Sequence, residues 1–130
     1  MTNGATRKDV LEYVSTQYGT EPEYLWRDAP GFAVLRNSQS RKWYAIIMDV
    51  NKSILGLSGD GKTDILDFKC PPYLTEILLK EKGFLPAYHM NKEHWVTLLL
   101  DGSLPKEKVF GVIDMSKELT DLKPPRHKKT

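Results

Sequence analysis

The segment from Tyr88 to Trp95 holds the densest set of reactive side chains in this chain. Its sequence, YHMNKEHW, packs two imidazoles, an amide, an ammonium group, a carboxylate and two aromatic rings into eight positions. Imidazole titrates near physiological pH, so His89 or His94 beside an acid could transfer protons. Nothing in the sequence fixes that geometry. An unrecognised enzyme using this segment is therefore one hypothesis. A structural role for His89 and Asn91, which share the motif with Tyr88, is another.

Metal and thiol chemistry are weaker alternatives. A zinc site would need His89 and His94 with Cys70, but their five-residue offset is not an established ligand spacing. Lys69 precedes Cys70, and a neighbouring cation lowers a thiol pKa. A small apolar cysteine at the end of a core strand is the preferred interpretation. We expect no metal, no cofactor and no catalytic residue.

Basic and aromatic residues suggest contact with nucleic acid. Residues 29–48 contain three cations and no acid, and they flank two aromatic rings. Cations neutralise phosphates, and aromatic rings stack on exposed bases. The competing interpretation is a solvated hairpin with a tryptophan over the core. The candidate contacts are Arg36, Arg41, Lys42, Trp43, Lys69, Lys92, His94 and Trp95.

The net charge of +2 resides in the C-terminal segment. Residues 123–130 carry four of the 19 basic residues and no acid, which leaves 15 basic against 17 acidic side chains in residues 1–122. Whole-domain charge therefore supplies no attraction for phosphate. We expect binding to be weak and salt-sensitive. We also expect one domain over residues 1–122, followed by a disordered basic tail over 123–130.

The sequence predicts a cytoplasmic protein. The apolar runs 44–48 and 96–100 are five residues long, far short of the roughly 20 that a membrane span needs. The first ten residues are polar and show no export signal. A single cysteine cannot form an internal disulfide.

Periodicity and turn residues predict the elements that must position these side chains. Thr6 and Asp9 resemble a capping box before a helix that ends at Gly19. Two hairpins follow, the first from strands 32–36 and 42–50, and the second from strands 54–57 and 63–70.

The second half of the chain predicts two more helices around a strand. A helix opens at Pro71-Pro72, buries Ile77 and ends at Lys82-Gly83. The last strand covers 94–100, residues 101–103 form a turn, and a final helix from Pro105 buries Leu119. We predict an α+β, two-layer sandwich in which helices pack on one face of an antiparallel meander sheet.

Alternation along the strands predicts which side chains share a face. Tyr44, Ile46, Met48 and Val50 point one way, and Trp43, Ala45, Ile47 and Asp49 point the other. We expect the second set to form the outer face, with Trp43 and Trp95 on the less buried side. Ser116 is expected to bond the carbonyl four residues back in its own helix.

The sequence resembles the MmcQ/YjbR family of small bacterial domains. The resemblance is carried by KWYA at 42–45, Lys69-Cys70 before Pro72, YHMNK at 88–92 with His94-Trp95, LDGS at 100–103, and Ser116 with Leu119. Glu93 stands where members often have a basic residue, and Lys117 where they often have an aromatic one.

This resemblance implies a CyaY-like, two-layer fold. It also implies DNA binding through a double-wing arrangement of hairpins, without an established reaction or cofactor. We therefore expect a non-enzymatic nucleic-acid-binding domain. The alternatives are a protein-interaction or small-ligand module that uses the open sheet face, or the enzyme hypothesis above.

Overall fold

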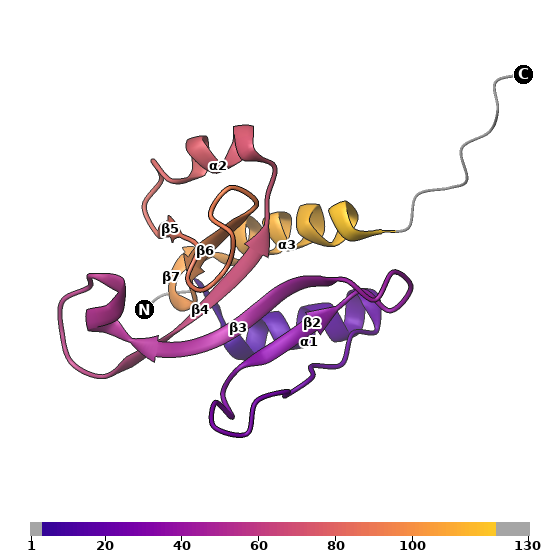
Figure 1. Ribbon diagram of the computed structural model, residues 1–130, viewed down its shortest axis with the longest axis horizontal. Coiled ribbons are helices and arrows are strands. Elements are labelled where there is room, and N and C mark those ends of the chain that lie inside the picture. Colours follow the sequence, from indigo (N-terminus) through magenta and orange to yellow (C-terminus); the bar gives the residue numbers. More distant parts are fainter. Residues whose placement is uncertain (1–3, 122–130) are drawn as a thin grey trace, which may run out of the picture.

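The computed structural model describes residues 4–121, in which two long helices cover one face of an antiparallel sheet (Figure 1). The sheet contains β2 (Ala33–Arg36), β3 (Trp43–Asn51), β4 (Lys62–Lys69), β5 (Phe84–Pro86) and β6 (Trp95–Leu99). The helices are α1 (Arg7–Tyr18), α2 (Pro72–Leu78) and α3 (Lys106–Thr120), with a 3₁₀ turn η1 at Lys52–Leu55. A separate two-stranded sheet pairs β1 (Gly4–Thr6) with β7 (Asp101–Pro105). The predicted α+β fold is confirmed.

Local signals set the ends of the first helix as predicted. The Asp9 carboxylate accepts hydrogen bonds from the backbone N–H of Thr6 at 2.9 Å and from its hydroxyl at 3.0 Å. Gly19 ends α1 in the left-handed conformation, with φ 70°, which costs glycine little. Both ends of α1 therefore follow directly from the sequence.

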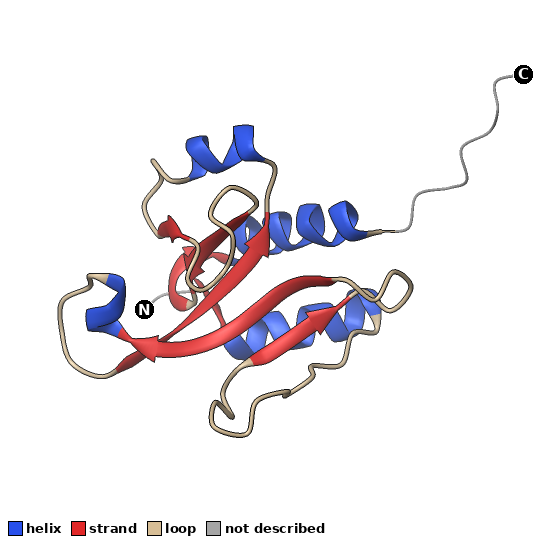
Figure 2. Ribbon diagram, in the orientation of Figure 1, coloured by secondary structure: helices blue, strands red, loops and turns tan. Residues whose placement is uncertain are grey.

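The sheet is a meander only in its first half. Its order is β2-β3-β4-β6-β5, so β6 pairs with β4, and β5 lies at the edge (Figure 2). The chain passes through α2 and then β5 before it returns to the sheet centre in β6. The meander prediction is corrected here, because β5 is too short to have been recognised from its sequence.

Three predicted elements differ in the structure. Residues 54–57 are not a strand: the N–H of Gly56, with φ 76°, bonds back to Ser53, and η1 with its loop simply connects β3 to β4. The predicted turn at 101–103 lies inside β7. The helix α2 ends at Leu78 and not at the Lys82-Gly83 dipeptide.

Two predicted core residues are exposed. Ile77 is 54% exposed and Leu119 is 43% exposed. Thr75 and Leu78 are buried in α2, while Ser116 and Thr120 are buried at the end of α3. The rest of the predicted inward faces is right, since Leu78 in α2 and Val109, Val112 and Ile113 in α3 are buried. The error therefore concerns one residue in each helix.

A β-bulge decides which residues face the helices. Leu35 pairs with Ala45 and Arg36 pairs with Trp43, so Tyr44 is the extra residue on β3. Ala45 and Tyr44 both pack in the helix-side core. The alternation is interrupted at this point. The predicted face assignment was therefore wrong for most of β3, because the bulge cannot be seen in one strand alone.

Both sheet faces are covered by apolar side chains. The helix-side core is the larger cluster, and it includes Ile47, Leu66 and Phe68. On the outer face, Ile46, Met48 and Ile65 form a second cluster that residues from the loops partly cover. No helix within residues 4–121 is long and apolar enough to span a membrane. The predicted domain end at 122 and the tail 123–130 lie outside the described residues.

Candidate functional site

The strand register brings the predicted contact residues to one end of the sheet. Lys69, the last residue of β4, lies opposite Trp95, the first residue of β6. Arg36, the last residue of β2, lies opposite Trp43, the first residue of β3. We call this region the basic end of the sheet. Its members are Arg36, Arg41, Lys42, Lys69, Lys92 and His94.

Arg36 is held by a carboxylate and by an aromatic ring. Its guanidinium donates to Glu23 through Nε at 2.9 Å and through Nη2 at 3.0 Å. Its Cζ also lies 5.9 Å from the centroid of Trp43. The paired guanidinium holds the pKa of Glu23 below its usual range. Arg36 therefore positions the β2 edge and Trp43, and its charge is already balanced.

Arg41 and Lys42 are the exposed cations of the β2–β3 turn. Arg41 adopts φ 66°, a left-handed conformation uncommon outside glycine. Its backbone N–H donates to Asn37 O at 2.8 Å, which closes the turn. The turn thus holds two adjacent cations at the end of the sheet, with both side chains free to reach a partner.

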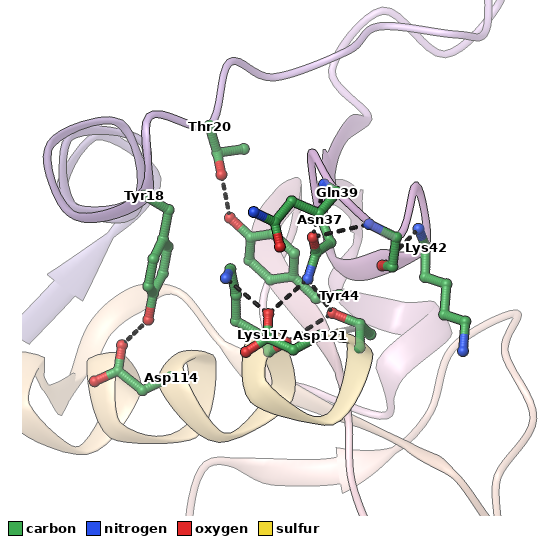
Figure 3. Close-up of polar contacts among 11 residues, drawn as sticks. Tyr18, Thr20, Asn37, Gln39, Lys42, Tyr44, Asp114, Lys117 and Asp121 are labelled. Carbon is green, nitrogen blue, oxygen red and sulfur yellow. Dashed lines mark hydrogen bonds and ion pairs between the residues drawn. The ribbon is translucent and has the colours of Figure 1, made fainter. Parts of the chain in front are cut away.

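Asn37 anchors this turn to the end of α3 (Figure 3). Its Nδ2 donates to Asp121 Oδ1 at 2.9 Å and to Thr120 Oγ1 at 3.1 Å. Its Oδ1 accepts from the backbone N–H groups of Gln39 and Ser40. Because Asn37 is buried, its bonds fix the turn rigidly on the body of the protein.

The remaining polar network in Figure 3 fastens the helices to each other and to β3. The Asp114 carboxylate accepts hydrogen bonds from the hydroxyls of Tyr13 and Tyr18. The hydroxyls of Thr20 and Tyr44 lie 2.7 Å apart. Burial raises the pKa of Tyr18 and raises that of Tyr44 to about 12. These phenols stay protonated and serve as structural ties.

Lys69, Lys92 and His94 approach the basic end from the other half of the sheet. Lys69 Nζ lies 5.9 Å from the Trp95 ring centroid. Lys92 is exposed but its Nζ donates to Ala87 O at 2.9 Å, and His94 is also exposed. Trp95 lies on the outer face as predicted, yet it is only 8% exposed. Trp95 therefore cannot stack on a partner without a rearrangement.

Asn91 has a structural role in the YHMNKEHW segment. Its Oδ1 accepts from the backbone N–H groups of Glu93 at 2.8 Å and His94 at 3.2 Å, and its carbonyl accepts from Trp95 at 3.0 Å. These bonds form the turn that leads into β6. The His94 carbonyl accepts from Cys70 N–H at 2.8 Å, which ties the turn to the end of β4.

Tyr88 begins a buried chain of hydrogen bonds. Its backbone N–H donates to Thr97 Oγ1 at 2.9 Å, and the Thr97 hydroxyl donates to Asp67 Oδ1. Asp67 is fully buried, and its Oδ2 has no hydrogen-bond partner among the described residues. Burial raises the pKa of Asp67 to about 7, an effect opposed by the Thr97 hydroxyl and the Lys92 charge. An acid between the apolar residues Leu66 and Phe68 of β4 was the missed sequence signal.

Ser116 joins β3 to β4 just beyond the register pair Ala45–Phe68 that ends their ladder. Its hydroxyl accepts from Lys69 N–H at 2.7 Å and donates to the Tyr44 carbonyl. The predicted bond within its own helix is corrected by this geometry. A side chain from α3 thus satisfies two backbone groups that the strands leave unpaired, and its position also fixes Lys69 at the basic end.

A cavity of about 440 Å³ opens on the outer face beside the basic end. Its aromatic walls are perpendicular to one another: the Trp26 ring meets Trp43 at 89° and Phe32 at 75°, each with centroids 5.9 Å apart. Ile46, Met48 and Met90 supply apolar lining. The polar members are Asp28 and His89, which are both exposed.

His89 joins the predicted motif to this cavity. It adopts φ 64°, and its ring lies 4.0 Å from that of Tyr88. The sequence identified His89 and Trp43 but missed Trp26 and Phe32, which come from a loop with no regular pattern. An aromatic cluster between Tyr24 and Phe32 was the only available signal.

Cys70 is structural in this arrangement. It is 1% exposed, and burial raises the pKa of its thiol, so the neighbouring Lys69 does not activate it. His89 faces the cavity, whereas Cys70 packs in the helix-side core. Within residues 4–121 no group of three His, Cys, Asp or Glu side chains could hold a metal ion.

Comparisons with known proteins place this architecture in a family. The YjbR family model matches residues 15–119. The chain is 42% identical to YyaQ of Bacillus subtilis over 115 residues, covering 88% of this chain and 98% of that one. YjbR of Escherichia coli is 38% identical over 52 residues, or 39% of this chain and 44% of that one.

Solved structures share the fold. A crystal structure of a Pseudomonas syringae protein has a TM-score of 0.86 at 40% identity, covering 89% of this chain and 99% of that one. A Deinococcus radiodurans protein has a TM-score of 0.67 at 24% identity, covering 88% of this chain and 78% of that one. The second likeness concerns the fold alone.

Proposed function

This chain belongs to the YjbR family, and we propose that it is a non-enzymatic DNA-binding protein that contacts phosphates with the basic end of its sheet. The observation that carries the proposal is the strand register, which gathers cations from three separate segments at one end of the sheet. The phosphate contacts are assigned to Arg41, Lys42, Lys69 and Lys92, none of which is paired with a carboxylate among the described residues.

Local charge balance supports this assignment. Two acids near the basic end are each paired with a cation that is not among the assigned phosphate contacts: Glu23 with Arg36, and Asp121 with Lys117 at 2.8 Å. Glu93 is exposed and has no such partner among the described residues, so it weakens the attraction. A local patch on a slightly acidic body favours weak binding that salt screens readily.

Binding is favoured over catalysis by how the reactive side chains are used. The Asn91 amide oxygen caps a turn, and the Cys70 thiol is buried with a raised pKa. His89 and His94 are exposed at different places around that turn, one at the cavity and one at the basic end. The polar groups of the segment therefore build a turn and an exposed surface, and they do not converge on one reactive centre.

Fluorescence anisotropy with labelled DNA at a series of salt concentrations tests the proposal. Four phosphate contacts predict that log K falls against log salt with a slope of about −3 to −4 for duplex DNA. The variant Arg41→Ala/Lys42→Ala should lower the magnitude of that slope by about 2. No binding by the wild type at low salt would refute DNA binding.

Two controls separate this surface from other sources of charge. The variant Lys52→Ala/Lys62→Ala removes the same charge near the β3–β4 connection, at the opposite end of β3, and should leave the slope nearly unchanged. A variant with Gln in place of Lys123, Arg126, Lys128 and Lys129 removes the basic residues of the C-terminal segment. Loss of all binding in that variant would assign the affinity to the segment and contradict the basic end.

A further inference from the structure

We propose that the outer-face cavity bounded by Trp26, Trp43 and His89 binds one unpaired nucleobase of a bound strand. This inference rests on the proposed DNA-binding function and specifies its ligand: single-stranded or locally opened nucleic acid. A base inside an intact duplex is covered on both faces by its neighbours, so it cannot enter a cavity of this kind.

The cavity has the shape and lining that a base requires. Its volume of about 440 Å³ lies within the roughly 300–1,000 Å³ of small-molecule sites. Trp26 and Trp43 stand at 89° to each other. A planar ring can therefore stack on one indole while its edge meets the face of the other. Met48 and Met90 adapt to either a purine or a pyrimidine.

Polar groups stand where the edge of a base would lie. The Asp28 carboxylate and the His89 imidazole both line the cavity and are exposed. A carboxylate accepts hydrogen bonds from the amino and ring N–H groups of bases. An otherwise apolar pocket with a few polar groups is the usual form of a site that orients a small planar ligand.

The cavity is continuous with the basic end. Trp43 connects the two, since it lines the cavity and lies opposite Arg36 of the basic end in the strand register. Lys92 follows His89 by three residues on the same turn. The phosphates flanking a bound base would thus lie near cations that the register has already gathered.

The backbone of His89 is a second, independent observation. A left-handed φ of 64° is unfavourable for a non-glycine residue, and such residues cluster at functional sites. The conformation directs the imidazole to the cavity and against Tyr88, while Asn91 builds the turn that follows. Among the described residues, Arg41 and His89 are the non-glycine residues with positive φ, and of the two only His89 lines the cavity.

The test compares a single strand with a duplex of the same sequence. Trp26→Ala removes an exposed loop ring that lines the cavity, and Tyr24→Ala removes a more exposed ring of the same loop that does not. We expect Trp26→Ala to weaken single-strand binding by about fivefold or more. Duplex affinity and the salt slope should stay unchanged, and Tyr24→Ala should match the wild type in every measurement. Equal single-strand affinities for Trp26→Ala and the wild type would overturn the base site while leaving DNA binding intact.

A mononucleotide tests the base-binding cavity independently of DNA binding by the basic end. Deoxyadenosine monophosphate is titrated into the full chain, and the indole N–H signals of its three tryptophans are followed by NMR. We expect the Trp26 and Trp43 signals to shift and the signal of buried Trp95 to stay. If these two signals shift but the protein binds no DNA strand, the base-binding cavity is supported and the proposed DNA-binding function is refuted. No shift of Trp26 and Trp43, and no effect of Trp26→Ala on strands, would refute the cavity.

Discussion

The Arg36 guanidinium lies over the Trp43 ring, with 5.9 Å between Cζ and the ring centroid, while it also pairs with Glu23. One side chain thereby links the loop that carries Trp26, the edge strand of the sheet and a wall of the cavity. Arg36 is therefore assigned a positioning role and not a phosphate contact.

Arg36→Lys keeps the positive charge but loses the planar fork that bonds Glu23 through two nitrogens. We expect single-strand affinity to fall about threefold or more, because a fully stacked base is worth about 1–3 kcal/mol and Trp43 is less well held. The salt slope should not change, since no phosphate contact is lost. Anisotropy at several salt concentrations measures both. A slope lower by about 1 would instead make Arg36 a direct phosphate contact.

Ser116→Ala should destabilise the fold by about 1–3 kcal/mol, because it leaves the Tyr44 carbonyl and the Lys69 N–H buried without a partner. Urea unfolding measures this loss, and hydrogen exchange at Lys69 should become faster. Ser103→Ala is the matched control: that serine is exposed, and its substitution should change stability by less than about 0.5 kcal/mol. Equal stability of the two variants would contradict the bridging role of Ser116.

Asp67 should make the fold less stable as pH rises from about 4 to about 7. Its folded pKa of about 7 lies above the ordinary aspartate value of 3.8, so over this window the folded state keeps a proton that the unfolded chain has lost. The contribution is fully present below the unfolded pKa and is lost as pH approaches the folded pKa. At most it amounts to about 4 kcal/mol.

Asp67→Asn imitates the protonated acid and should remove this contribution. Relative to the wild type, its unfolding free energy should therefore rise between pH 4 and pH 7, then level off. The control is Asp64→Asn, because Asp64 lies on the same strand but is partly exposed and paired with Arg7. Apart from the loss of that ion pair, the unfolding free energy of this variant should depend on pH as that of the wild type does. A constant difference between Asp67→Asn and the wild type across this range would show that Asp67 is ionised in the fold.

His89→Gly should be more stable than His89→Ala by about 1 kcal/mol, because alanine keeps the left-handed strain that glycine relieves. Both variants should lose affinity for a single strand through the missing imidazole. Denaturant unfolding gives the order of stability. At His94, whose φ is not positive, alanine should be at least as stable as glycine. If alanine is at least as stable as glycine at position 89 as well, the backbone of His89 is not strained.

The sequence alone determined the features that depend on near neighbours in the chain. The capping box at Thr6, the stop at Gly19 and the first hairpin are each set by interactions within a few residues. The repeated spacing of apolar residues is enough to predict an α+β fold in which helices pack on one face of an antiparallel sheet. The YHMNKEHW segment also placed the chain in its family, because the string is long and specific.

Only the tertiary structure decided the faces of the sheet and the site. The bulge at Tyr44 exists only in the register between two strands, and it puts Trp43 on the outer face together with Ile46. The cavity joins rings from residues 26–43 to side chains at 89–90, so no local pattern could predict it. The dense motif is mostly a turn built by Asn91. The roles proposed for this segment are those of His89 at the cavity and Lys92 at the basic end, because packing far along the chain determines which side chains remain exposed.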